Sequence, residues 1–252
     1  MKLYKKELLE IKVYDTRDEM GADAAKEAAE YIRSLMNTKE EVNIVFAAAP
    51  SQNDFLLHLS KEDIEWGRIN AFHMDEYIGL AKDAPQGFGN YLADHIFNLV
   101  PFKSVNYIYD ENKTPEDICA SYTKLLEENP TDIIFMGVGE NGHIAFNDPH
   151  VAFFNDPLAV KVVDLDRKCR NQQVNDGCFA TIDDVPTHAI TLSIPTMMKA
   201  DRLFVIVPTA LKAEAIGNIY NGEITEACPA SILRTHKAAT LYTDVAGAQA
   251  IA

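Results

Sequence analysis

The chain has 252 residues, 47% of them hydrophobic and 24% charged, and a formal net charge of −15. This length and apolar content are typical of one globular α/β domain with a sizeable buried core. The negative charge excludes nucleic acid and anionic membranes as default partners, because the long-range field repels both. An anionic small molecule remains compatible with the chain if its site carries local cations or helix N-termini.

In chain order, the sequence predicts a strand at 11–14, a helix at 17–36, a strand at 43–48, a helix from 51, a strand at 69–74 and a helix at 89–99. It then predicts a strand at 105–109, a helix at 115–127, strands at 133–138, 188–193 and 203–207, a helix at 210–220 and a strand at 239–243. This alternation predicts a Rossmann-like α/β fold, a mostly parallel sheet with helices on both faces, as a single domain over 1–252. Ligands of such folds bind beyond the carboxyl ends of the strands.

Targeting signals and cysteine spacing bear on the compartment. The N-terminal MKLYKKELLE has no apolar segment with a small-residue cleavage site, and no apolar run approaches the roughly 18 residues of a membrane helix. The four cysteines follow no disulfide or zinc spacing, which favours reduced thiols. We therefore expect a cytoplasmic protein. The oligomeric state stays open, a homo-oligomer included.

A candidate anion site follows the strand at 43–48. The loop there reads Ala-Pro-Ser-Gln-Asn and leads into a helix, with Ser51 and Asn53 as candidate caps and Gln52 between them. The free N–H groups and dipole of a helix N-terminus attract anions. The alternative interpretation is an ordinary cap without a ligand.

Two adjacent acids, Asp75 and Glu76, follow the strand at 69–74. A carboxylate at the end of an apolar run is partly desolvated, which suits a general base. The alternative is a pair of loop acids that cap the next segment or meet a lysine.

A glycine-framed histidine follows the strand at 133–138. In the run GENGHIAFNDP, His143 lies close in sequence to Glu140 and Asp148, and carboxylates fix the tautomer of such a histidine. The framing favours catalysis over a structural histidine. GVGENG opens no helix of an early βαβ unit, which argues against a dinucleotide site, and no metal-binding spacing accompanies the histidines.

Basic residues in the second half of the chain are candidate phosphate ligands. Arg167, Lys168 and Arg170 form a basic cluster, and Lys212 follows the strand at 203–207 near a helix N-terminus. Guanidinium and ammonium groups both bind phosphate. Each could equally be a solvated surface charge.

Together, FHMDEY at 72–77 and GVGENGHIAFNDP at 137–149 resemble the glucosamine-6-phosphate deaminase family. The resemblance covers nearly the whole chain. It implies ring opening, aldose–ketose isomerisation and hydrolytic loss of ammonia from a sugar phosphate, without a metal ion or an organic cofactor.

The resemblance also implies roles for particular residues. Asp75 would move the proton between C2 and C1, with Glu76 beside it, and His143 would assist opening of the pyranose ring. Asp148 would hold His143, and Lys212 would bind the phosphate.

The chain departs from the family pattern at four places. The phosphate loop lacks its usual Gly and Thr or Ser residues, which leaves Ser51, Gln52 and Asn53. Asn141 stands where some members carry an acid, and Asp148 replaces the more usual Glu. The phosphate arginine expected near position 172 is absent, so Arg170 is the predicted substitute, followed by Arg167.

The stretch after Pro149 also lacks the Ser-rich pattern of members activated by the N-acetylated sugar phosphate, which predicts no such activation.

Three other functions compete with a glucosamine-6-phosphate deaminase. A changed sugar pocket would favour galactosamine 6-phosphate. A lactone hydrolase of the 6-phosphogluconolactonase type shares the fold and a GxxGH turn, but its typical SDER-like and SLFP-like runs are replaced here by MDEY and FNDP. A sugar-phosphate sensor would need a DNA-binding appendage, which this acidic chain lacks.

Overall fold

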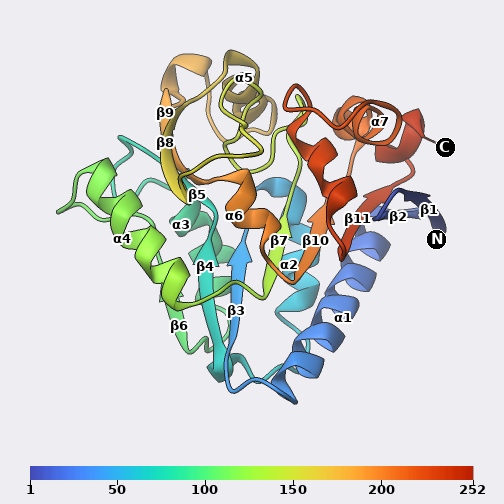
Figure 1. The fold of residues 1–252 in the computed structure, drawn as a ribbon, viewed down its shortest axis with the longest axis horizontal. Coiled ribbons are helices and arrows are strands. Elements are labelled where there is room, and N and C mark those ends of the chain that lie inside the picture. The colour runs from blue at the N-terminus through green and yellow to red at the C-terminus, as the bar shows by residue number, and fades with distance from the viewer. Residues whose placement is uncertain (252) are drawn as a thin grey trace.

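The computed structural model describes residues 1–251, and its main feature is an eight-stranded sheet (Figure 1). The strand order is β1 (Lys2–Lys6), β2 (Leu9–Tyr14), β11 (Ala239–Asp244), β10 (Arg202–Ile206), β7 (Ile133–Met136), β3 (Val42–Phe46), β4 (Ile69–His73) and β6 (Ser104–Asn106). Every neighbouring pair is parallel except β1 with β2. The predicted mostly parallel α/β sheet is confirmed.

Helices cover both faces of this sheet because alternate strand residues are apolar on each side. In β7, Phe135 packs with α1 (Arg17–Met36), α2 (Asn53–Leu59) and α3 (Phe88–Leu92), followed by a π-helical turn at Ala93–Phe97. Its neighbour Ile134 packs with α4 (Pro115–Glu128), α6 (Ile194–Met198) and α7 (Ala213–Asn221). The helix α4 is capped by Thr114, whose side chain accepts from the Asp117 N–H. No helix within residues 1–251 is long and apolar enough to cross a membrane.

A second, smaller sheet was not expected from the sequence. Its antiparallel strands run in the order β5 (Asp75–Tyr77), β9 (His188–Leu192) and β8 (Val160–Asp164), and α5 (Arg167–Asn175) follows β8. The strand predicted at 188–193 therefore belongs to this small sheet and not to the parallel one. A single residue, Met74, separates the end of β4 from the start of β5, so the chain passes here from one sheet to the other.

Candidate active site

A cavity of about 240 Å³ opens beyond the carboxyl ends of four adjacent strands, β10, β7, β3 and β4. Residues that follow each of these strands line it, together with side chains from α1, α3 and α5: Arg17, Ala47, Ala48, Ala49, Pro50, Ser51, Met74, Asp75, Phe88, Gly137, Val138, Gly139, His143, Ala145, Phe146, Gln172, Gln173, Asp176, Pro208, Thr209, Leu211 and Lys212. The cavity lies at the edge where the sequence predicted ligand binding. Asp75, His143, Ser51 and Lys212, each predicted from a different segment, all line this one cavity.

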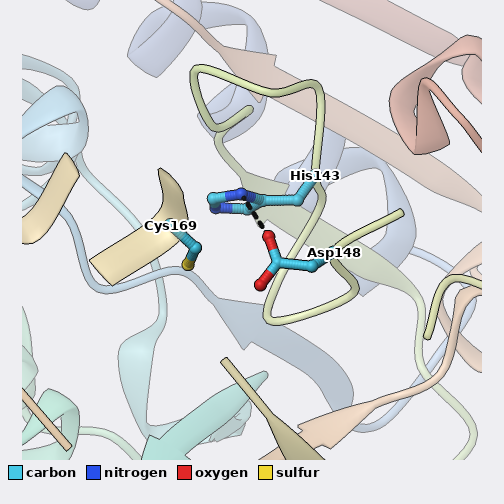
Figure 2. A group of neighbouring side chains, drawn as sticks. All are labelled: His143, Asp148 and Cys169. Atoms are coloured by element: carbon cyan, nitrogen blue, oxygen red, sulfur yellow. Dashed lines mark ion pairs between the residues drawn. The ribbon is translucent and has the colours of Figure 1, made fainter. Parts of the chain in front are cut away.

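His143 is held from one side by Asp148 and Asn141. Its Nδ1 atom lies 2.6 Å from Oδ1 of Asn141 and 3.2 Å from Oδ1 of Asp148, the latter drawn in Figure 2. The Asn141 amide nitrogen donates to Asp148 at 2.8 Å, which fixes the direction of the amide. Both neighbours of Nδ1 are acceptors, so Nδ1 carries a proton and Nε2 of the neutral ring can accept one.

Glycine is required beneath this ring. A Cβ built on Gly139 would lie 2.1–2.3 Å from three atoms of the His143 imidazole, and Gly142 has a φ of +82° in the turn. Any larger residue at 139 would displace the ring, and an L-residue at 142 would be strained. The two glycines thus allow the turn to fold back over itself with the histidine inside.

Asp148 is fully buried and ionised. Burial raises its pKa, but the hydrogen bond and charge of His143, followed by the Asn141 amide and the Asp166 N–H, outweigh burial and lower the pKa to about 2. The carboxylate therefore keeps its charge at any physiological pH.

Cys169 completes a group with His143 and Asp148 whose ligand atoms lie within 4.8 Å of one another (Figure 2). These three donors are of kinds that could hold a metal ion. However, Nδ1 of His143 is already hydrogen-bonded, and burial followed by the Asp148 charge raises the pKa of the Cys169 thiol well above its usual value. A protonated thiol is a poor ligand, so the geometry fits a hydrogen-bonded support for His143 better than a metal centre.

Asp75 begins β5 and is almost fully buried at the cavity wall. Burial, followed by the neighbouring Glu76 charge, raises the pKa of Asp75 well above its usual value. A raised pKa makes the carboxylate a stronger base.

Glu76 does not line this cavity, which corrects its prediction as a catalytic residue. Its carboxylate accepts from the backbone N–H groups of Tyr77, Phe88 and Gly89 at 2.8–2.9 Å. Side chains alternate across a strand, so an acid next to Asp75 in β5 must point to the other side. Glu76 anchors the start of α3 instead.

Of the predicted anion ligands, Ser51 and Lys212 line the cavity. Gln52 lies behind Ser51, where its amide donates to the Ser51 hydroxyl at 2.9 Å and to the Ile206 carbonyl at 3.2 Å. Asn53 accepts a hydrogen bond from Tyr91 and does not line the cavity. Gln52 and Asn53 are thus corrected from ligands to supports of the loop.

The prediction for Arg170 also needs correction. Its guanidinium donates to the carbonyls of Ile182 and Val185 and does not line the cavity, and neither does Arg167. On α5 and at its C-cap, the residues that reach the cavity are Gln172, Gln173 and Asp176. Arg170 and Gln172 are two residues apart, so their side chains point in different directions from the helix.

Sequence reasoning missed Arg17 and Thr209, which also line the cavity. Arg17 is the first residue of α1, and Thr209 has a φ of +82° and is held by its N–H to Asp244 at 3.1 Å. A cation at a helix N-terminus opposes the helix dipole, so an arginine is unfavourable there. This unfavourable position is the one sequence feature that could have pointed to Arg17. No sequence signal marks Thr209, because threonine rarely adopts positive φ.

Comparison with known proteins places the chain in a family. A sequence model of the family described as glucosamine-6-phosphate isomerases/6-phosphogluconolactonase matches residues 15–242. The chain belongs to this enzyme family. Among its members, a glucosamine-6-phosphate deaminase of Bacillus cereus (strain B4264) is 31% identical over 222 residues, 88% of this chain and 83% of the relative. Another from Bacillus cereus (strain G9842) is 32% identical over 213 residues, 84% and 79% of the two chains.

Solved structures of the glucosamine-6-phosphate isomerase/6-phosphogluconolactonase family share the fold. A monomeric glucosamine-6-phosphate deaminase superposes with a TM-score of 0.85 at 28% identity, covering 95% of this chain and 99% of that one. A 6-phosphogluconolactonase from Thermotoga maritima gives a TM-score of 0.76 at 17% identity, covering 93% and 98%. At this lower identity the likeness shows the fold alone. The resemblance read from the two motifs is confirmed at the level of the family.

Proposed function

We propose that this chain is a glucosamine-6-phosphate deaminase that converts glucosamine 6-phosphate and water into fructose 6-phosphate and ammonia. Residues 1–252 would act as one amino-sugar-phosphate deaminase domain in the cytoplasm. The observation that carries the proposal is that Asp75 and His143 share one cavity with Ser51 and Lys212. This arrangement offers a base and a proton-exchanging imidazole to the sugar, and a hydroxyl and a cation to its phosphate.

In the first step, His143 opens the pyranose ring. Its Nε2 takes the proton of the C1 hydroxyl and returns a proton to the ring oxygen, which leaves the open-chain aldehyde. Asn141 and Asp148 keep Nδ1 protonated and hold the ring in place through both transfers. They act as positioning residues.

In the second step, the Asp75 carboxylate removes the proton from C2 and delivers it to C1. As the C1 carbonyl oxygen gains a proton and the C2 amine loses one, the amine becomes an imine, which water hydrolyses to release ammonia and the ketose. Burial suits this role because the raised pKa of Asp75 makes it a stronger base. Only protons and water move, so the proposed reaction needs no metal ion or organic cofactor.

A substrate panel with ammonia detection tests the proposal. We expect the protein to release ammonia and fructose 6-phosphate from glucosamine 6-phosphate at a higher kcat/KM than from galactosamine 6-phosphate. In parallel, 6-phosphogluconolactone is offered and acid release is followed. Faster lactone hydrolysis without ammonia release from either amino sugar would overturn the deaminase in favour of the lactone hydrolase.

A further inference from the structure

Arg17 reaches the cavity from an unexpected direction. It is the first residue of α1, on the face of the sheet that α1, α2 and α3 cover. Even so, it lines the same cavity as Ser51 and Lys212. Within residues 1–251, Arg17 and Lys212 are the lysine and arginine side chains that line this wall. The predicted substitute, Arg170, is engaged elsewhere by the carbonyls of Ile182 and Val185.

The close packing of α1 on α2 explains the position of Arg17. Gly21 lies one turn after Arg17 on the same face, and a Cβ there would stand 2.9 Å from atoms of Asp54 and Phe55. Only glycine allows this approach, so the first turn of α1 lies directly over the loop that leads into α2. Arg17 therefore lies beside the loop that contains Ser51.

The guanidinium is also oriented there. Its Nε donates to the Asp54 carboxylate and its Nη2 donates to the Pro50 carbonyl. These bonds use two of the five N–H donors and leave three for a ligand. A cation at this end of α1 opposes the helix dipole, which is an unfavourable place for an arginine with only a structural role.

We propose that Arg17 binds the phosphate group of the substrate from the α1 side of the cavity while Lys212 binds it from the opposite wall. This inference rests on the proposed function, since it assumes a sugar phosphate as the substrate. The guanidinium suits the task because it stays charged in any surroundings. By contrast, burial lowers the pKa of Lys212, although Asp176 and Glu140 act against this effect.

The test compares Arg17→Gln with Arg33→Gln, a matched control in the last turn of the same helix that pairs with Glu62 and donates to the Asp63 carbonyl. We expect Arg17→Gln to raise KM for glucosamine 6-phosphate about 10- to 100-fold, since charged hydrogen bonds contribute on this scale, and to leave kcat nearly unchanged. Competitive inhibition by inorganic phosphate should weaken by the same factor. Arg33→Gln should change neither value.

A third variant separates ligand binding from a merely structural role. Asp54→Asn removes the ion pair that ties α1 to the loop but keeps the guanidinium. If Arg17 acts only through this tie, Asp54→Asn raises KM as much as Arg17→Gln does, and the inference is wrong. We expect a clearly smaller rise, and Arg17→Lys should recover part of the loss.

Direct calorimetry of inorganic phosphate binding distinguishes this inference from the proposed function. If the wild-type protein binds phosphate in an Arg17-dependent manner but releases no ammonia from any amino-sugar phosphate, the function is wrong and the phosphate site stands. If ammonia is released but Arg17→Gln keeps the wild-type KM and phosphate affinity, the function stands and the phosphate site is wrong.

Discussion

The cavity residues fall into two groups, which we call the Asp75 end (Asp75 and His143) and the Ser51 end (Ser51 and Lys212), and the groups differ in the sheet that supports them. Asp75 lies in the small antiparallel sheet opposite Thr191, and the loop after His143 is tied to that sheet by the Phe146 N–H, which donates to the Thr191 hydroxyl at 3.1 Å. Ser51 and Lys212 instead follow strands of the large parallel sheet. Asp75 thus lies in the small sheet, His143 follows β7 of the large sheet in a loop tied to the small one, and the anion ligands follow strands of the large sheet alone.

Because of this difference, substitutions in the two groups should change different kinetic parameters. Buried, hydrogen-bonded groups at the Asp75 end act on reaction steps, so their loss should appear in kcat. The cations at the Ser51 end, buried Lys212 and partly exposed Arg17, act on binding, so their loss should appear in KM. A variant of one end that changed the parameter of the other would break the comparison.

The largest effect is expected for Asp75→Asn. An amide cannot accept the C2 proton, so kcat should fall about 10³-fold, within the range of general-base catalysis. KM should stay near the wild-type value, because the phosphate end is intact. Steady-state ammonia release measures both, and a wild-type kcat would contradict the role of Asp75.

His143→Gln should lower kcat about 10²-fold. The smaller loss is expected because glucosamine 6-phosphate opens its ring slowly in water without the enzyme, whereas C2 is not deprotonated at a useful rate. A substrate analogue locked in the open-chain form should restore much of the lost rate. Equal losses with closed and open substrates would contradict the ring-opening role.

Asp148→Asn should destabilise the protein by about 2 kcal/mol at pH 7. The folded-state pKa of about 2 lies below the ordinary value of 3.8, so the ionised carboxylate stabilises the fold above pH 4. This contribution is lost as the pH falls toward 2. Urea unfolding of both proteins from pH 7 to pH 3 should show the difference between them shrinking. A constant difference would mean that Asp148 acts by packing alone.

Glu76→Gln should shift the acid limb of the kcat/KM profile to lower pH. Burial, followed by the Glu76 charge, raises the pKa of Asp75, so removing that charge makes the Asp75 carboxylate easier to form. Activity is therefore retained to a lower pH. The matched control is Glu65→Gln on the exposed surface, which should leave the limb in place. If the acid limb of Glu76→Gln stayed at the wild-type pH, burial alone would raise the pKa of Asp75.

The smallest effect is expected from N-acetylglucosamine 6-phosphate. Added at subsaturating substrate, it should not raise the rate, because the stretch after Pro149 lacks a Ser-rich pattern. Weak competition at high concentration is the expected result. A rise in rate would contradict the prediction.

The alternation of strands and helices was enough to predict the parallel sheet and the edge at which Asp75 and His143 meet. The small sheet was missed because β5 has only three residues and pairs with β9 more than 110 positions away. Such distant pairing leaves no local periodicity in the sequence.

The anion end was harder to predict because it depends on which way side chains point. Arg170 and Gln172 are two residues apart, and on a helix that spacing puts them on different faces. Arg17 reaches the site only because Gly21 lets α1 approach α2. Neither helix–helix distance nor helix rotation can be read from composition or motif.

The contact between Gly139 and the His143 ring has an evolutionary consequence. Since a Cβ at position 139 would occupy the place of the imidazole, the two positions cannot vary independently. An alanine at 139 is tolerable only after the histidine has been replaced by a smaller side chain, and a histidine can return only after the glycine has. Descendants of this chain that keep histidine at 143 should therefore also keep glycine at 139, and those that lose the glycine should have lost the histidine.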